Sequence, residues 1–248
     1  MQPTQSRCRS CNEAKKLVRS HVVPESFCKP FVREGKAAKI LAPHEYVKVS
    51  HTGIYDQTIL CDECEQLLSA PDDYAQKLLH LHIVEFEAIM VAGELVAERI
   101  VDYDYALLHR FILAVLWRAS VSTHDFFKEV YLGPHEDKIR RIVFGGESAN
   151  NEYPFVAGRL VHVTKNNIMP APIRERIDDT NYWRIYAGDF HFWVKVDSGR
   201  LTPNSFAELQ ASSGNPLIFL CRDLAGSPEY RAAITAVKLR KVGRASPG

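Results

Sequence analysis

Two Cys-x-x-Cys pairs carry the clearest chemical signal in the sequence. Cys8 and Cys11 form the first pair, Cys61 and Cys64 form the second, and forty-nine residues separate the two. Each pair places two thiolates on one tight turn, and two such turns supply the four sulfurs of a closed tetrahedral zinc site. Zinc ribbons usually separate their pairs by about 15–20 residues, so buried apolar thiols are the alternative interpretation. We predict a structural Zn²⁺ on these four cysteines.

A histidine lies between the pairs, in the segment Ser20-His21-Val22-Val23-Pro24. An imidazole titrates near neutrality, so it is a suitable general base for deprotonating water. Phosphodiester hydrolysis also requires a cation that offsets the charge developing on oxygen. Asp56 lies five residues before the second pair and Glu65 follows it directly. Their carboxylates suit Mg²⁺ or Mn²⁺, whereas the thiolates suit zinc.

These residues, in this order, resemble the zinc-stapled HNH (ββα-metal) endonucleases over residues 7–80. The four cysteines match the zinc staple of that family, and His21 to Pro24 matches its histidine motif. The resemblance implies a treble-clef fold, nucleic acid as substrate (DNA rather than RNA), and His21 as the catalytic base. Ser20 replaces the usual Asp or His, Asp56 replaces an Asn, and Glu65 replaces an Asn or His. Asp56 and Glu65 would then hold or organise the second cation.

These departures leave alternatives open. In the first, the protein is a zinc-stabilised adaptor that binds nucleic acid or protein without hydrolysing either. In the second, His21 is itself a zinc ligand and one cysteine is released. His44 and His51, in the segment between the pairs, could also complete or replace the catalytic set.

A fainter resemblance covers most of the chain. Residues 111–122, residues 132–140 and the Leu-Cys-x-x-Cys-Glu segment at 60–65 are similar to those of a family of uncharacterised bacterial proteins. That likeness implies no settled function. The resemblance to zinc-stapled nucleases implies a bacterial or phage-defence setting, in which a partner protein of the same system can be required.

The charge of the chain is unevenly distributed. The net charge of +1 creates no global field toward nucleic acid or membrane, but residues 1–40 contain nine Lys or Arg and three Glu. A basic segment around a metal site suits a phosphate backbone, because each neutralised phosphate releases counterions. A solvated face that offsets acidic stretches elsewhere would give the same pattern.

The sequence also predicts where the protein works. The first residues lack the apolar core of a signal peptide, and no apolar run approaches the ~18 residues that span a bilayer. We therefore expect a cytoplasmic protein with no membrane partner. In a reducing cytoplasm, paired cysteines bind metal more often than they form disulfides.

Periodicity and turn residues predict an α+β fold in two parts. Residues 1–80 form the zinc-binding module, with a long insertion over 27–57, a strand at 58–60 and a helix after Cys64. Residues 81–248 are helical and then β-rich, and would provide a substrate or partner surface. The expected elements are helices over 105–121 and 134–144, strands over 155–163, 182–196 (a hairpin) and 217–221, and a basic tail over 231–244.

Five further features have a structural or a functional interpretation. Arg118, at the end of the apolar helix, requires a partner, whereas Trp117 and Cys221 fit packing roles. His124-Asp125 is better explained as a helix-end turn than as a catalytic pair. An aromatic group could stack nucleobases on one sheet face: Tyr182, Trp183, Tyr186, Phe190, Phe192 and Trp193.

Overall fold

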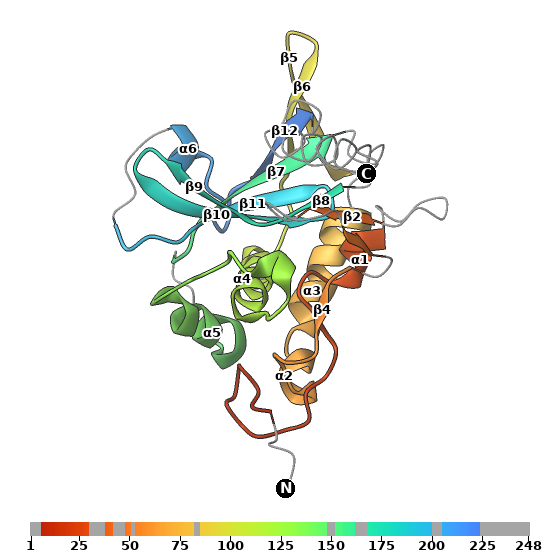
Figure 1. Cartoon of the computed structure of the whole chain (residues 1–248). Coiled ribbons are helices and arrows are strands. Elements are labelled where there is room, and N and C mark those ends of the chain that lie inside the picture. The colour runs from red at the N-terminus through yellow and green to blue at the C-terminus, as the bar shows by residue number, and fades with distance from the viewer. Residues whose placement is uncertain are drawn as a thin grey trace, which may run out of the picture.

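The computed structural model describes residues 6–29, 38–41, 48–50, 53–81, 85–147, 152–161, 168–199 and 205–223. His44, His51 and the predicted basic tail lie outside these ranges. Within them, a large β-sheet lies over a layer of helices, and the cysteine-containing segment extends from the end of the helical layer far from the sheet (Figure 1). The α+β class predicted from the sequence is confirmed.

The described residues form twelve strands and six α-helices. The strands are β1 (Ser20–His21), β2 (Ala38–Leu41), β3 (Lys48–Ser50), β4 (Tyr55–Asp56), β5 (Glu87–Val91), β6 (Glu94–Ile100), β7 (Phe155–Val161), β8 (Ile168–Pro170), β9 (Ile173–Ile177), β10 (Thr180–Ala187), β11 (Phe190–Lys195) and β12 (Leu217–Asp223). The helices are α1 (Glu25–Cys28), α2 (Asp62–Gln66), α3 (Ser69–Gln76), α4 (Tyr105–Val121), α5 (His135–Gly145) and α6 (Ser205–Glu208). A π-helical turn (Lys77–Leu81) and a 3₁₀ turn (Asp125–Phe127) complete the set.

Seven strands form the main sheet in the order β5-β6-β12-β7-β11-β10-β9. Neighbours are antiparallel except β12 and β7, which are parallel. The predicted hairpin is confirmed: Ala187 pairs with Phe190, and Gly188 between them has φ +68°, a conformation that glycine adopts without steric cost. The strands predicted near 155 and 217 are also present, as β7 and β12.

Helix α4 has the bounds predicted from its continuous apolar run. The Asp104 carboxylate accepts a hydrogen bond from the backbone N–H of Leu107 (3.0 Å), which caps the first turn. Twelve of the seventeen residues are buried, so the helix crosses the core. The predicted second helix is α5, which ends at Gly146 in the left-handed conformation (φ +71°).

One predicted strand is wrong in position. β4 lies at Tyr55–Asp56 rather than at 58–60. The Asp56 side chain accepts a hydrogen bond from the backbone N–H of Thr58 (2.8 Å), and this turn ends the strand. The following backbone instead binds the first cysteine turn, because Ile59 and Leu60 accept from the N–H groups of Arg9 (2.8 Å) and Val18 (2.9 Å).

The helix expected after Cys64 is divided in two. α2 ends at Gln66 and α3 begins at Ser69. Pro71 has no N–H to donate to the carbonyl of Leu67, and its ring would clash there, so the division falls where the proline requires it.

One large apolar cluster joins both predicted parts of the chain, and a smaller cluster around Val156, Tyr182 and Trp193 is separate from it. The large cluster extends from Cys8 and Phe27 through α4 to Phe219, and the rings of Phe27 and Phe111 lie 5.3 Å apart. The segment predicted as an insertion contributes β2, which pairs in parallel with β8. The boundary at residue 80 stays a prediction about sequence organisation. Among the described helices, none combines the length and apolarity required to cross a bilayer.

Candidate metal centre and adjoining basic pocket

The four predicted cysteines come together in the fold. The Sγ atoms of Cys8, Cys11, Cys61 and Cys64 all lie within 4.8 Å of one another, and three of the four residues are buried. A regular tetrahedron with Zn–S bonds of about 2.3 Å has sulfur–sulfur edges of about 3.8 Å. Cys11 and Cys61 are 4.0 Å apart. The cluster could therefore hold a metal ion such as zinc.

Local backbone hydrogen bonds build the two cysteine turns. In the first, the N–H of Cys8 donates to Glu13 (3.0 Å) and that of Asn12 donates to Cys8 (2.9 Å). Asn12 has φ +61°, which asparagine tolerates better than most residues. In the second, Cys61 precedes α2 and accepts from the N–H of Glu65 (3.0 Å). The two turns also contact each other directly, because the backbone N–H of Cys61 donates to the Sγ of Cys8 (3.4 Å).

The electrostatics of the thiols favour a bound cation. Burial raises the pKa of the Cys8 thiol, but backbone N–H groups of Cys11, Cys61 and Ser10 outweigh it and lower the pKa to about 7. Burial raises the pKa of Cys64 and of Cys61, so these thiols need a positive partner to ionise at neutral pH. Four thiolates with no open position match a structural zinc site rather than a catalytic one.

His21 lies outside this cluster, on the β1–β4 pair. Ser20 pairs with Asp56, and His21 pairs with Tyr55. Paired residues share a face of the ribbon and successive residues alternate. His21 and Tyr55 therefore lie on one face, with ring centroids 5.9 Å apart, and Ser20 and Asp56 lie on the other. Within the described residues, the group of potential metal ligands contains four cysteines and no histidine.

Asp56 is buried and heavily hydrogen-bonded. One carboxylate oxygen accepts from the N–H (2.8 Å) and hydroxyl (2.6 Å) of Thr58. The other accepts from the Ser122 hydroxyl (2.9 Å) and from the N–H (2.7 Å) and hydroxyl (3.0 Å) of Thr123. Burial raises the pKa of Asp56, but these hydrogen bonds outweigh it and hold the pKa below its ordinary value. Asp56 thus ties β4 to the end of α4.

Glu65 binds Ser20. The Ser20 hydroxyl donates to a carboxylate oxygen of Glu65 at 2.6 Å, and Ser20 is fully buried. Burial raises the pKa of Glu65, although the Ser20 hydrogen bond and the charge of Arg118 oppose it. The two positions at which the sequence departs most from the HNH pattern therefore contact each other directly.

Arg118 has the partner that its burial requires. Its two terminal nitrogens each donate to an oxygen of Asp72 at 3.0 Å, and Nε donates to the Ala114 carbonyl at 3.3 Å. This fork-shaped pair joins α4 to α3. The sequence indicates that Arg118 needs an anion, but no local pattern identifies Asp72.

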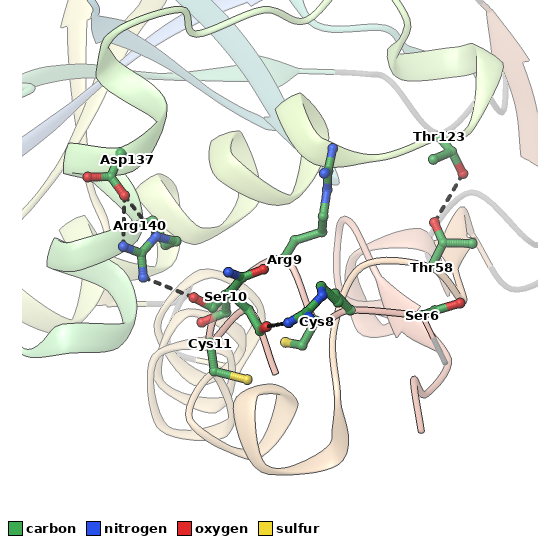
Figure 2. Close-up of a pocket in the computed structure, with 11 residues that line it drawn as sticks. Ser6, Cys8, Arg9, Ser10, Cys11, Thr58, Thr123, Asp137 and Arg140 are labelled. Carbon is green, nitrogen blue, oxygen red and sulfur yellow. Dashed lines mark hydrogen bonds and ion pairs between the residues drawn. The ribbon is translucent and has the colours of Figure 1, made fainter. Parts of the chain in front are cut away.

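A pocket of about 810 Å³ adjoins the first cysteine turn (Figure 2). We call it the basic pocket, and it is lined by Ser6, Arg7, Cys8, Arg9, Ser10, Cys11, Asn12, Thr58, Thr123, Asp137 and Arg140. The Arg9 side chain extends from the turn between Arg140 on one side and Thr58 and Thr123 on the other. Arg7 and Arg9 belong to the basic segment noted in the sequence. Arg140 comes from α5 and was missed, because nothing near it in sequence relates it to the cysteines.

Hydrogen bonds fix the walls of the basic pocket. Arg140 donates to the Ser10 carbonyl (2.9 Å) and to Asp137 (2.7 and 3.1 Å). Arg7 donates to the Asn12 carbonyl (2.8 Å). Across the pocket, the hydroxyls of Thr58 and Thr123 are 3.2 Å apart. The pocket is thus framed jointly by the first cysteine turn, the residues after β4, and α5.

The other sequence candidates have structural roles. Each of the six aromatic residues that could have stacked nucleobases is at most 7% exposed, so they are closed to nucleobases. His124 accepts from the N–H of Phe126 through Nδ1, in the predicted helix-end turn. Cys28 is buried with its sulfur 3.9 Å from that of Met169, and burial raises its pKa to about 12. Burial likewise raises the pKa of Cys221 to about 11.

Comparisons with known proteins add no relative to this description. No protein-family model matches the sequence, and neither a curated protein nor a solved structure matches it.

Proposed function

We propose that this protein is a zinc-stabilised nucleic-acid-binding protein that contacts phosphate in the basic pocket. The observation that carries the proposal is the gathering of Arg7, Arg9 and Arg140 around one cavity beside the thiolate cluster. A planar guanidinium donates two parallel hydrogen bonds to phosphate oxygens. The hydroxyls at the same pocket are additional donors of the kind that contact phosphate.

The charges in the pocket leave Arg9 available to a ligand. Asp137 is the one carboxylate that lines the pocket, and it is occupied by Arg140 and by Arg141, a residue of α5. Arg9 is exposed, and its side chain forms no hydrogen bond or ion pair with the residues that the structure describes, although its backbone N–H donates to Ile59. Zinc with four thiolates carries a net charge of −2, so part of the arginine charge offsets the metal centre. A phosphate-binding role therefore has to be separated from simple charge compensation.

The order of elements supports the finer part of the proposal, a treble clef of HNH type. A cysteine turn, the β1–β4 pair, a second cysteine turn and helix α2 follow one another. That is the order which the resemblance implied. In this proposal the zinc holds the two turns together and thereby shapes the wall of the basic pocket.

The test is nucleic-acid binding measured by fluorescence anisotropy between 50 and 200 mM salt, with labelled DNA and RNA. Arg9→Ala should weaken binding and reduce the salt slope by about one, because one phosphate contact is lost. Arg176→Ala is the matched control: it removes the same charge from an exposed position on β9. Equal effects of the two substitutions would mean that only net charge matters, and the pocket would lose its role.

Hydrolysis of the bound strand, with His21 as general base, is a second proposal. The observation in its favour is that His21 is only half-buried and that the exposed Arg19 lies nearby, over the Tyr55 ring. The carboxylates favour it less, since both Asp56 oxygens and one Glu65 oxygen already accept hydrogen bonds. Mg²⁺ or Mn²⁺ would have to displace some of these donors, or take the remaining Glu65 oxygen.

Plasmid nicking tests this second proposal. Supercoiled DNA and single-stranded RNA are incubated with the protein and Mg²⁺, Mn²⁺ or EDTA, beside a His21→Ala variant of unchanged zinc content. Cleavage that depends on the divalent ion and is lost in His21→Ala supports hydrolysis. Binding without cleavage in every condition leaves the adaptor, and cleavage that survives His21→Ala assigns the reaction to another site.

A further inference from the structure

A stacked pair of side chains lies close to the basic pocket. The guanidinium carbon of Arg19 is 3.8 Å from the centroid of the Tyr55 ring. Arg19 is exposed and the Tyr55 side chain is 40% exposed. The His21 ring packs against the same tyrosine in an edge-on geometry. The Arg19 guanidinium is therefore a flat, positively charged surface that packs on the Tyr55 ring, and the His21 ring in turn contacts Tyr55.

Exposed aromatic rings are rare in the described part of the chain. Among its exposed large apolar side chains, only Tyr55 and Tyr131 are aromatic. The aromatic group on β10 and β11, for which the sequence left base stacking open, is buried. Guanidinium and aromatic planes are the side-chain surfaces on which unpaired bases stack. Of these two tyrosines, Tyr55 is the one over which a guanidinium lies in the described structure.

The stacked pair and the basic pocket are held in a fixed relation. Tyr55 lies three residues before Thr58, a pocket residue, so their Cα atoms are at most about 11 Å apart. Asp56 lies between them and is hydrogen-bonded to Thr58 and to Thr123, both of which line the pocket. The two features are therefore close together, but Tyr55 and Asp56 point to opposite faces of the β1–β4 pair, so a strand of nucleotides that contacts both features passes around this ribbon.

We propose that the basic pocket and the Arg19–Tyr55 pair together bind single-stranded nucleic acid. The pocket takes a backbone phosphate, and an unpaired base stacks on the Arg19 guanidinium. This inference rests on the proposed function and names the class of nucleic acid. A duplex keeps its bases stacked inside the helix, so it can use the pocket but not the stacked pair. Because every base has a flat face, this mode is tolerant of sequence.

The experiment uses fluorescence anisotropy to compare the affinity of the protein for three nucleic-acid ligands. They are a single strand, a fully abasic strand of the same length, and the corresponding duplex. The wild-type protein should bind the single strand about 5- to 150-fold more tightly than the abasic strand, which is the range expected for one stacked base. Both strands carry the same phosphate charge, so counterion release does not produce this difference.

Two variants locate the effect. Arg19→Lys keeps the positive charge and loses the planar group, so it should weaken binding of the intact strand and leave the abasic strand unchanged. Tyr55→Leu should act in the same way, and Arg9→Ala should weaken binding of all three ligands. Zinc content and the far-UV circular dichroism spectrum check that each variant is folded.

The outcomes separate this inference from the proposed function. If single strand, abasic strand and duplex bind equally and Arg9→Ala weakens all three, the pocket binds phosphate and the stacking inference is wrong. If no nucleic acid binds to the folded, zinc-loaded protein, both proposals fail. A loss confined to the intact strand in Arg19→Lys establishes the stacked base.

Discussion

Removing Asp72 should destabilise the fold strongly, because it leaves the buried Arg118 guanidinium without its anionic partner. Arg118 is 1% exposed, and Asp72 accepts two of its three recorded hydrogen bonds. A guanidinium does not lose its proton in proteins, so Asp72→Ala leaves a buried positive charge with one bond of 3.3 Å to the Ala114 carbonyl. Breaking a buried ion pair by removing one partner typically costs about 3–5 kcal/mol.

Two related variants should lose less stability than Asp72→Ala. Arg118→Met leaves Asp72, whose side chain is 18% exposed and which can also be neutralised by taking up a proton. The double variant Arg118→Met/Asp72→Leu replaces both charges with apolar groups, and such replacements are often neutral or stabilising. We therefore expect Asp72→Ala to be the least stable of the three variants and the double variant to approach the wild type.

Urea unfolding at pH 7 and constant zinc concentration measures the difference. With a slope of about 3 kcal/mol per molar urea, a loss of 3–5 kcal/mol lowers the midpoint by about 1–1.7 M. The double variant should lie within about 0.5 M of the wild type. If the double variant loses as much as Asp72→Ala, the cost arises from packing at α3 and α4, and the unpaired-charge argument would be refuted.

Three further changes probe other contacts. Asp56→Ala leaves the N–H groups of Thr58 and Thr123 without an acceptor and should cost about 2–5 kcal/mol in urea unfolding, with Thr58→Val as a milder control. Since the folded-state pKa of Asp56 is lowered, its contribution is present above pH ~4 and is lost as the pH falls through the folded pKa. The difference in melting temperature between wild type and Asp56→Asn should therefore shrink on acidification, and a constant difference would contradict this. Gly158→Ala places a Cβ 2.4 Å from Nε2 of the buried His191 and should cost about 1–3 kcal/mol, whereas Gly145→Ala, whose nearest neighbour is at 3.9 Å, should be harmless in the same thermal melt. The purified protein should contain one zinc ion per chain by elemental analysis, and a strong chelator should lower both its melting temperature and its affinity for nucleic acid; an unchanged melting temperature after complete zinc removal would exclude a structural metal.

Local sequence patterns were sufficient for the elements whose cause is local. The helix over residues 105–121 follows from a continuous apolar run, and its start is fixed by the Asp104 cap. The β10–β11 hairpin follows from two apolar strands around a glycine. The position of β4 was missed because a side chain, Asp56, takes over the backbone N–H of Thr58 and ends the strand. Periodicity carries no information about such a bond.

Contacts between distant segments account for what the sequence could not predict at the site. Arg140 lies 130 residues after Ser10, whose carbonyl it binds, and Asp72 lies 46 residues before Arg118. These pairs depend on how α3, α4 and α5 pack together, and no short motif records that packing. The cysteine cluster was predictable because each pair is a short local motif and a structural zinc site requires four ligands.

The difference between local patterns and contacts made in the fold also applies to the mechanism that the resemblance to HNH endonucleases implies. Spacing places Asp56 and Glu65 near the histidine segment, but it does not determine which atoms their carboxylates bind. In the fold, five hydrogen bonds engage Asp56 and a buried hydroxyl engages Glu65. Hydrogen bonds to a charged group contribute about 1.5–3 kcal/mol each, so a cation must displace interactions that already stabilise the fold. Among the described residues the Arg9 side chain has no such hydrogen bonds to give up, and phosphate binding is for this reason the function that we propose first.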